Sequence, residues 1–140
     1  EERHEVDLRG LDGRLRGRGV RIAYPAVDPE TGSMSFRFVA DPADMEVHGF
    51  GFREPSRHAP EASPGQLDCI VVPALAADPR GHRIGYGAGY YDRTLPLFTP
   101  AATTIAVVFD FQLIVEVAST DGDVPVDWVA TDTRTLQAER

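Results

Sequence analysis

The chain has 140 residues, enough for one globular domain with a single core, and 42% of them are hydrophobic, an ordinary value for such a domain. A formal net charge of -8 argues against binding to nucleic acid or to an acidic membrane surface, and no apolar run approaches the ~20 residues of a membrane helix. Residues 1–7 are too charged for a signal peptide and the single cysteine, Cys69, cannot form an internal disulfide, so we expect a cytoplasmic protein.

The first half of the chain is predicted to form a helix, a pair of strands and a long loop. Leu8, Leu11 and Leu15 recur at helical spacing, and glycines that can end a helix follow them. Further on, alternation of apolar and polar residues indicates strands, and a stretch rich in Pro, Gly, Ser and Ala indicates a loop. The elements expected here are a helix over 6–17, strands over 20–26 and 34–39, a turn over 28–32, one or two helical turns over 41–48 and a loop over 49–65.

In the second half, short apolar runs alternate with segments of helical character. Such alternation implies a parallel sheet with both faces covered. We therefore expect an α/β fold with three layers, α/β/α, and a mostly parallel sheet. Cys69 and Trp128 are predicted to be core residues of its strands. The elements expected here are strands over 68–74, 103–109 and 126–130, helices over 90–98 and 112–116, and a polar tail from Thr133.

The most informative stretch is 81–95, with the sequence GHRIGYGAGYYDRTL. Three glycines stand at alternate positions, Gly85, Gly87 and Gly89, with Arg83 before them and an aromatic-led run after them. Glycine reaches positive φ without a steric clash, so such a loop can aim several backbone N–H groups at one anion. A strand, a glycine loop and a helix start together predict a phosphate site. The glycine pattern alone is weak, because a tight turn would also need it and its spacing differs from the dinucleotide-binding fingerprint.

The residues around this loop resemble the signature of the 5-formyltetrahydrofolate cyclo-ligase (5,10-methenyltetrahydrofolate synthetase) family. The family pattern runs roughly P-G-x-A-F-D, two variable residues, then G-x-R-x-G-x-G-x-G-Y-Y-D. This chain departs from it at Ala74, Ala77 and Ala88. It matches at Pro73, Ala76, Asp78, Gly81, Arg83, Gly85, Gly87, Gly89, Tyr90, Tyr91 and Asp92. Weaker elements keep the family order over essentially the whole chain, at 4–7, 20–25, 52–55 and 123–132.

The resemblance implies a single cyclo-ligase-like domain over residues 1–140, with the α/β fold described above. Members of the family usually begin with a helix bearing a Lys/Arg pair that grips ATP, followed by a first strand. This sequence starts where that strand would end, so we expect a domain that is N-terminally incomplete relative to the family and lacks that helix and strand. All basic residues of the chain are arginine, so no lysine here can replace the missing one.

By this resemblance the function is the ATP- and Mg²⁺-dependent conversion of 5-formyltetrahydrofolate into 5,10-methenyltetrahydrofolate, with release of ADP and phosphate. We expect a monomer whose partners are small molecules, and the polyglutamate preference for the substrate is left open. The alternative is a non-catalytic folate- or nucleotide-binding relative, favoured by the missing N-terminal segment and the three alanine departures. An RNA-binding adaptor finds no support, because the sequence has no stripe of basic and aromatic residues.

The resemblance also assigns the site residues. The catalytic residues are Arg83, Tyr91 and Asp92. ATP is bound by Arg83, Gly85, Tyr86, Gly87, Ala88, Gly89, Tyr90 and Tyr91. The folate is bound by Glu5, Glu54, Tyr86, Gly87, Ala88, Gly89 and Tyr90. Mg²⁺ is held by Asp92 and Asp123, with Asp121 and Asp127 as open alternatives for the second carboxylate.

Each of these assignments has a plainer alternative. Arg83 could form a surface salt bridge, and Asp92 could be a carboxylate that the start of a helix favours. Asp123 could belong to a solvated acidic loop. Glu5 could be an acid at a helix N-terminus, and Glu54 could belong to a rigid loop.

Overall fold

The computed structural model describes residues 6–47 and 53–139, which divide into two compact units. The N-terminal unit is formed by Asp7–Gln66, and the C-terminal unit by Val6 together with residues 67–139. One domain over 1–140 stays a prediction. In the part of the chain that is described, no helix is long and apolar enough to cross a membrane.

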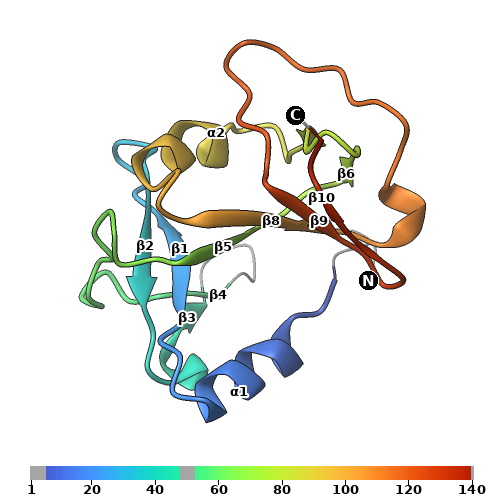
Figure 1. Ribbon diagram of the computed structural model, residues 1–140. Helices are drawn as coiled ribbons and strands as arrows, with labels where there is room; N and C mark the ends of the chain where they lie inside the picture. The colour runs from blue at the N-terminus through green and yellow to red at the C-terminus, as the bar shows by residue number, and fades with distance from the viewer. Residues whose placement is uncertain (1–5, 48–52, 140) are drawn as a thin grey trace. The chain divides into compact units, whose positions relative to one another are not determined.

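The N-terminal unit consists of one helix, short turns and two small antiparallel sheets (Figure 1). Strands β1 and β2 pair around the predicted turn, with Val27 opposite Met34. The helix begins three residues later than the leucine spacing predicts, and the first strand also begins three residues later. The elements are α1 (Arg9–Gly17), β1 (Ala23–Val27), β2 (Met34–Phe38), the 3₁₀ turn η1 (Pro42–Asp44), β3 (Glu46–Val47) and β4 (Arg53–Glu54).

Helix α1 is held by polar contacts rather than by the leucine face that its sequence suggests. Asp12 is buried in the helix, whereas Leu11 is exposed. The Asp12 carboxylate accepts hydrogen bonds from Arg16 Nε at 2.6 Å and from the Tyr24 hydroxyl of β1. Arg16 Nη1 donates to the carbonyl of Ala40 at 2.9 Å. Burial and the hydrogen bond to Asp12 raise the pKa of Tyr24 to about 12, so at neutral pH its hydroxyl remains a donor.

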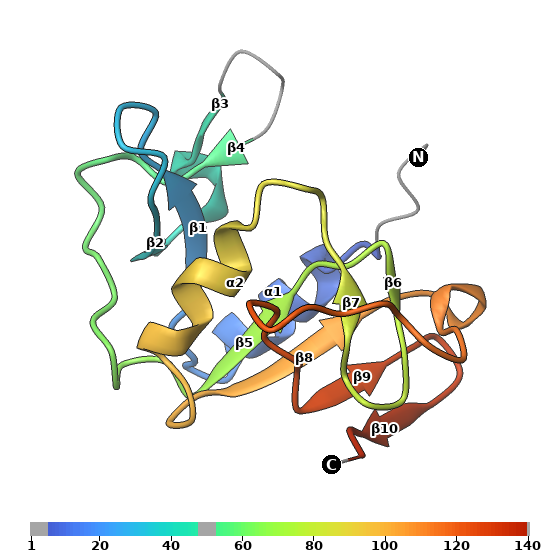
Figure 2. The same ribbon diagram turned by 90° about the horizontal axis from the view of Figure 1, so that it is seen from above.

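The C-terminal unit is built on a mixed four-stranded sheet with the order β10-β9-β8-β5 (Figure 2). The pairs β5–β8 and β8–β9 are parallel and β9–β10 is antiparallel. A separate two-stranded hairpin, β6–β7, follows β5. The elements are β5 (Cys69–Val72), β6 (Ala76–Ala77), β7 (Arg83–Ile84), α2 (Tyr90–Thr94), the 3₁₀ turn η2 (Leu95–Leu97), β8 (Thr103–Val107), the 3₁₀ turn η3 (Asp110–Gln112), β9 (Trp128–Ala130) and β10 (Thr135–Gln137).

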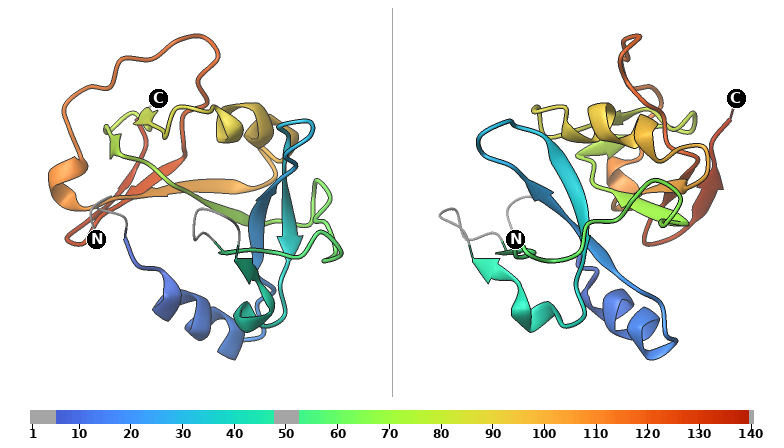
Figure 3. Two further views of the ribbon diagram at one scale, coloured as in Figure 1. Left: turned by 180° about the vertical axis from the view of Figure 1, so that it is seen from behind. Right: turned by 90° about the vertical axis from the view of Figure 1, so that its left-hand side faces the viewer.

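One face of this sheet carries α2, the β6–β7 hairpin and the irregular segment 113–126 (Figures 1 and 3). Ile70 and Val72 of β5 are buried, whereas the alternate residues Cys69 and Val71 are exposed. The prediction that Cys69 is a core residue is therefore wrong, because successive side chains of a strand point to opposite faces. The α/β class is confirmed with a mixed sheet, in which β5–β8 and β8–β9 are parallel and β9–β10 is antiparallel, and the three-layer arrangement stays a prediction.

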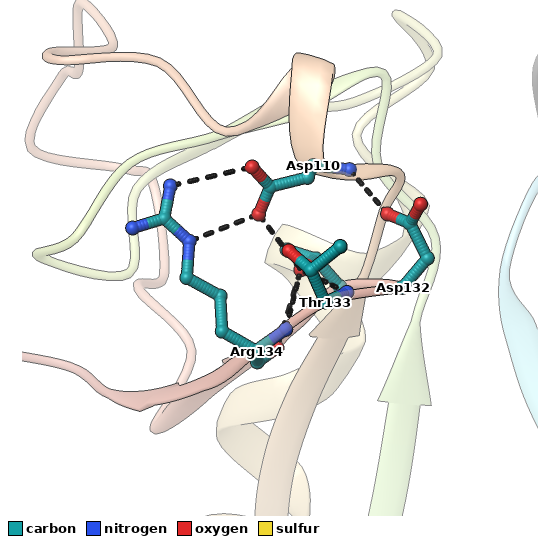
Figure 4. Close-up of polar contacts among 5 residues, drawn as sticks. Asp110, Asp132, Thr133 and Arg134 are labelled. Carbon is teal, nitrogen blue, oxygen red and sulfur yellow. Dashed lines mark hydrogen bonds and ion pairs between the residues drawn. The ribbon is translucent and has the colours of Figure 1, made fainter.

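A clasp of polar residues joins the end of β8 to the β9–β10 turn (Figure 4). Asp110 accepts hydrogen bonds from Arg134 Nε and from the Thr131 hydroxyl, both at 2.9 Å, and its own N–H donates to the Asp132 carboxylate at 2.7 Å. These hydrogen bonds, that of Arg134 first, hold the pKa of Asp110 below its usual value. The clasp explains why Thr135–Gln137 forms a strand where the polar composition predicts a tail.

Two of the predicted helices differ from the structure. The helix expected over 112–116 is wrong: a 3₁₀ turn ends at Gln112, Leu113 N bonds back to the carbonyl of Asp110, and Ile114 N donates to the carbonyl of Ala77 in the β6–β7 hairpin. The helix expected over 90–98 breaks into α2 and η2 near Pro96, since proline cannot donate the backbone hydrogen bond of a helix interior. Strands β3, β4, β6 and β7 are too short to show a strand period in the sequence.

Candidate functional site

The glycine loop leads from β7 to α2, and its glycines are required for different reasons. Gly87 and Gly89 have φ of 102° and 73°, a backbone conformation that other residues adopt with strain. Gly85 has no positive φ, but a Cβ there would lie 2.9 Å from Arg83 Nη1. A Cβ at Gly87 would meet open space within 4 Å, so this part of the loop leaves room for a ligand.

Arg83 lies beneath the loop with its side chain only 6% exposed. Its Nη1 donates to the carbonyl of Pro73 at 3.3 Å, and its Nη2 donates to Asp92 Oδ1 at 3.4 Å. Its guanidinium carbon stands 5.7 Å from the centre of the Tyr91 ring. Nε is buried and has no hydrogen-bond partner among the described residues, so the guanidinium retains one unsatisfied donor.

Asp92, in the first turn of α2, connects Arg83 to the segment before β9. Its Oδ1 accepts the hydrogen bond of Arg83 and a second one from Val124 N at 3.0 Å. Both hydrogen bonds to this carboxylate among the described residues fall on Oδ1, and the side chain is 29% exposed. Oδ2 therefore remains accessible to a cation.

Asp123 precedes Val124, and one oxygen of its carboxylate accepts a backbone hydrogen bond, as in Asp92. Its Oδ2 accepts a hydrogen bond from Thr120 N at 2.8 Å, which closes a turn in the loop. Within the part of the chain that is described, no group of three or more His, Cys, Asp or Glu side chains is arranged to hold a metal ion. A pair of carboxylates is nevertheless sufficient for Mg²⁺, which often keeps water and phosphate oxygens as its other ligands.

Arg83, Tyr91, Asp92 and Asp123 form a cluster of titratable side chains that interact electrostatically. Burial lowers the pKa of Arg83 from its usual value, and the electrostatic interaction with Asp92, then those with Tyr91 and Asp123, act in the opposite direction. Burial raises the pKa of Tyr91 to about 12, so its hydroxyl is protonated at neutral pH. At this pH the cluster therefore contains a cationic guanidinium, a neutral phenol and carboxylates.

The outer side of the loop is covered by Arg93. Its Nη1 donates to the carbonyl of Ala88 at 2.8 Å, and its guanidinium carbon lies 5.3 Å from the centre of the Tyr90 ring. A Cβ at Gly89 would come within 3.0 Å of the same Nη1. Tyr86, in contrast, is 44% exposed and presents its side chain to solvent. No role of Arg93 is predicted from the sequence, although its position one helical turn after Gly89 is a signal for this contact.

The three candidates for the second carboxylate differ in their contacts and exposure. Asp127 Oδ2 accepts hydrogen bonds from Thr104 N at 2.9 Å and from the Thr104 hydroxyl at 3.2 Å, where β8 and β9 begin. This contact links β8 to the residue that precedes β9, so Asp127 has a structural role in the sheet. Asp121 is exposed on the loop. Asp123 acts electrostatically on Arg83 and adjoins the contact to Asp92, which favours it as the partner of Asp92.

The residues predicted for the folate are not brought together by the described contacts. Glu5 lies outside the described residues. Glu54 belongs to β4 of the N-terminal unit, where its Oε1 accepts a hydrogen bond from Val27 N at 3.3 Å. That contact agrees with the alternative of a rigid loop, and a substrate role for Glu54 stays a prediction, as do the assignments of the glycine loop to ATP and folate.

The sequence and the fold both have clear relatives. The model of the 5-formyltetrahydrofolate cyclo-ligase family matches residues 4–132. The 5-formyltetrahydrofolate cyclo-ligase of Mycolicibacterium smegmatis is 42% identical over 100 residues, which are 71% of this chain and 52% of that protein. The Escherichia coli K12 protein of the same name is 27% identical over 133 residues, 93% of this chain and 73% of that protein.

Two solved structures share the fold. The NMR structure of Aquifex aeolicus 5,10-methenyltetrahydrofolate synthetase aligns with a TM-score of 0.81 and 30% identity over 97% of this chain and 67% of that one. The 5,10-methenyltetrahydrofolate synthetase from Mycoplasma pneumoniae aligns with a TM-score of 0.67 and 24% identity over 89% and 65% of the two chains. The chain spans about half the length of the M. smegmatis relative. By the family match over most of its length, the chain belongs to the 5-formyltetrahydrofolate cyclo-ligase family.

Proposed function

We propose that the protein is an ATP- and Mg²⁺-dependent cyclo-ligase that converts 5-formyltetrahydrofolate into 5,10-methenyltetrahydrofolate with release of ADP and phosphate. The observation that carries the proposal is the arrangement of Asp92 and Asp123 beside the buried Arg83, directly under the glycine loop. Family membership and the names of the relatives support the reaction.

The donor set fits Mg²⁺. Asp92 and Asp123 each commit one oxygen to a backbone N–H and keep the other for a ligand. Magnesium prefers hard oxygen ligands, and one or two carboxylates with phosphate oxygens and water are a common set. When bound, the metal would neutralise charge on the phosphate oxygens during transfer.

The glycine loop suits the nucleotide. Tyr86, Gly87 and Ala88 are exposed, and the positive φ of Gly87 turns the backbone where no other atoms come close. Backbone N–H groups in such a turn can bind phosphate oxygens. The unsatisfied Nε of Arg83 supplies a further donor under the loop, while Nη2 donates to Asp92 and Nη1 donates to the carbonyl of Pro73.

In this proposal, the residues of the chain mainly position charges. Phosphoryl transfer depends mostly on alignment and charge neutralisation, so the site needs little acid–base chemistry. Asp92 is held from one side by Arg83 and from the other by the backbone of Val124, so its free oxygen has a fixed direction. Tyr91 keeps its proton and places a neutral phenol beside the guanidinium. Glu5, Tyr90 and Glu54 are proposed to contact the folate.

A spectrophotometric assay tests the proposal with this 140-residue chain. The methenyl product absorbs in the near ultraviolet and the formyl substrate does not, so a rise in absorbance that needs both ATP and Mg²⁺ is expected. Titration calorimetry with 5-formyltetrahydrofolate and with Mg²⁺·ATP runs in parallel. Binding of either ligand without an absorbance rise would reject the enzyme and favour a non-catalytic binding relative. We also propose that the protein acts as a monomer in the cytoplasm.

A further inference from the structure

Asp78 is a buried carboxylate for which the proposed function gives no task. It is 1% exposed and stands at the turn between β6 and β7. Its Oδ1 accepts hydrogen bonds from Arg80 N at 2.9 Å and from His82 N at 3.0 Å. Its Oδ2 accepts a third one from Val117 N at 2.8 Å. Burial of a charge is costly unless hydrogen bonds compensate it, so these three backbone donors hold the side chain firmly in place.

These hydrogen bonds join two parts of the chain that are distant in sequence. Oδ1 folds the β6–β7 turn, while Oδ2 binds the irregular segment 113–126. The same segment is attached to the hairpin near both of its ends, by Ile114 N to the carbonyl of Ala77 and by Val126 N to the carbonyl of Gly81, each at 2.8 Å. Asp78 supplies the side-chain contact between these backbone contacts. The segment 113–126 and the hairpin are therefore fastened to each other in one register.

Both parts lead directly to the cluster below the glycine loop. Arg83 is the first residue of β7 in the hairpin, and the segment continues from Val117 to Asp123 and Val124. Arg83 and Val124 meet at the same oxygen of Asp92. A shift of the segment against the hairpin would consequently change the direction of Asp92 and the distance between the two carboxylates.

We propose that Asp78 is a positioning residue that sets the spacing of Asp92 and Asp123 for Mg²⁺·ATP by fastening the segment 113–126 to the β6–β7 hairpin. This inference rests on the proposed function for its ligand. It assigns the effect to one hydrogen bond, from Val117 N to Oδ2. Asp78 itself lies too deep in the hairpin turn to contact a ligand, being 1% exposed.

The substitution Asp78→Asn tests this hydrogen bond. The amide oxygen of asparagine can keep the two contacts within the turn, while its NH₂ group would face Val117 N, donor against donor. Asp78→Ser is a second variant, because a serine hydroxyl can still fold the turn but is too short to reach the segment. Asp110→Asn is the matched control, since it weakens the clasp at the β9–β10 turn of the same unit without touching the hairpin.

Two measurements decide the outcome. We expect Asp78→Asn and Asp78→Ser to raise the Kd for Mg²⁺·ATP about ten-fold, equivalent to about 1.4 kcal/mol, with the Kd for 5-formyltetrahydrofolate unchanged. Hydrogen exchange over 113–126 is expected to become faster while exchange in β8 keeps its protection. The control is expected to lower the melting temperature and leave both Kd values as they are.

Unchanged exchange over 113–126, or faster exchange with an unchanged Kd for Mg²⁺·ATP, would overturn the inference. A rise in the same Kd for the control would do so as well, because the effect would then reflect general loosening. Failure of the proposed function is a separate result, visible in the unmodified chain as the absence of Mg²⁺·ATP binding and turnover. In that event the exchange measurement still decides whether Asp78 fastens the segment.

Discussion

Replacing Gly81 with alanine should destabilise the protein by more than the usual cost of losing a glycine. Gly81 lies in the β6–β7 turn with a φ of 87°, a conformation that costs a residue with a side chain about 1–2 kcal/mol. A Cβ built there would also stand 2.2 Å from the backbone oxygen of Val126 and 3.1 Å from Cβ of Ala138. No real Cβ tolerates the first of these distances, so the backbone of Val126 has to move away.

That movement breaks a hydrogen bond whose loss can be estimated. Val126 N donates to the carbonyl of Gly81 at 2.8 Å, and Val126 is fully buried. A buried backbone group left without its partner costs about 1–3 kcal/mol. Together with the conformational cost, Gly81→Ala should lower the free energy of unfolding by about 2–5 kcal/mol, a large share of the roughly 5–15 kcal/mol typical of a domain.

Urea denaturation monitored by circular dichroism measures this difference. Gly87→Ala is the control in the same unit, because Gly87 also has a positive φ, 102°, but nothing lies within 4 Å of its Cβ position. The control should lose only about 1–2 kcal/mol. If the two variants lose the same free energy within about 0.5 kcal/mol, the close approach of Gly81 to Val126 does not exist as described and the reasoning fails.

Two further predictions concern the cluster below the loop. Asp92→Asn keeps an acceptor for Val124 N but removes the charge of the carboxylate. Mg²⁺-dependent turnover should therefore fall by about 10³-fold or more, while folate binding stays largely intact. An active variant in the absorbance assay would show that the metal assignment is wrong. Burial raises the pKa of Tyr91 from 10.0 to about 12 in the folded protein. Above pH 10, Tyr91 therefore loses its proton in the unfolded chain before it does so in the folded one, and the free energy of unfolding should decline toward pH 12. Tyr91→Phe should flatten that decline in urea titrations from pH 9 to 12, and an unchanged slope would contradict it.

The parts of the fold that the sequence predicts are those with a local signal. The parallel strands β5 and β8 of the mixed sheet stand out as short apolar runs, and Gly17 and Gly19 correctly end α1. The glycine loop is likewise visible because its residues are adjacent and carry a family motif. These features depend on neighbours in the chain, which is the information that periodicity and motifs contain.

The errors arise where distant partners decide the structure. Cys69 is apolar enough for a core, yet its exposure depends on which face of β5 the rest of the unit covers. Residues 113–116 have the composition of a short helix, but Ile114 N donates to the carbonyl of Ala77 in the β6–β7 hairpin. Thr135–Gln137 becomes a strand because Asp110 and Arg134 fix the turn before it. Tertiary contacts of this kind override local propensity.

In the candidate site too, features with a local sequence signal are predicted and features that depend on distant residues are not. The sequence predicts Arg83 as a phosphate ligand and Asp92 as a Mg²⁺ ligand, and the structure brings the two side chains together. It does not predict that Arg83 is buried with two nitrogens turned inward, or that Val124 shares Asp92 Oδ1. Those contacts join positions 10 and 32 residues apart, beyond the reach of spacing arguments.

Because the β6–β7 hairpin is hydrogen-bonded to the segment 113–126, the glycine-rich stretch 81–95 cannot be expected to keep its structure when it is transferred to another protein. A short peptide with the sequence of residues 81–95 would contain Arg83, the glycines and Asp92, but not Val117, Asp123 or Val124. Closing a loop of more than 30 residues costs entropy that only a folded sheet can repay, so these contacts form with the tertiary structure and not before it. Grafted alone onto another scaffold, residues 81–95 would keep the sequence motif but would lose the contacts that orient Arg83 and Asp92.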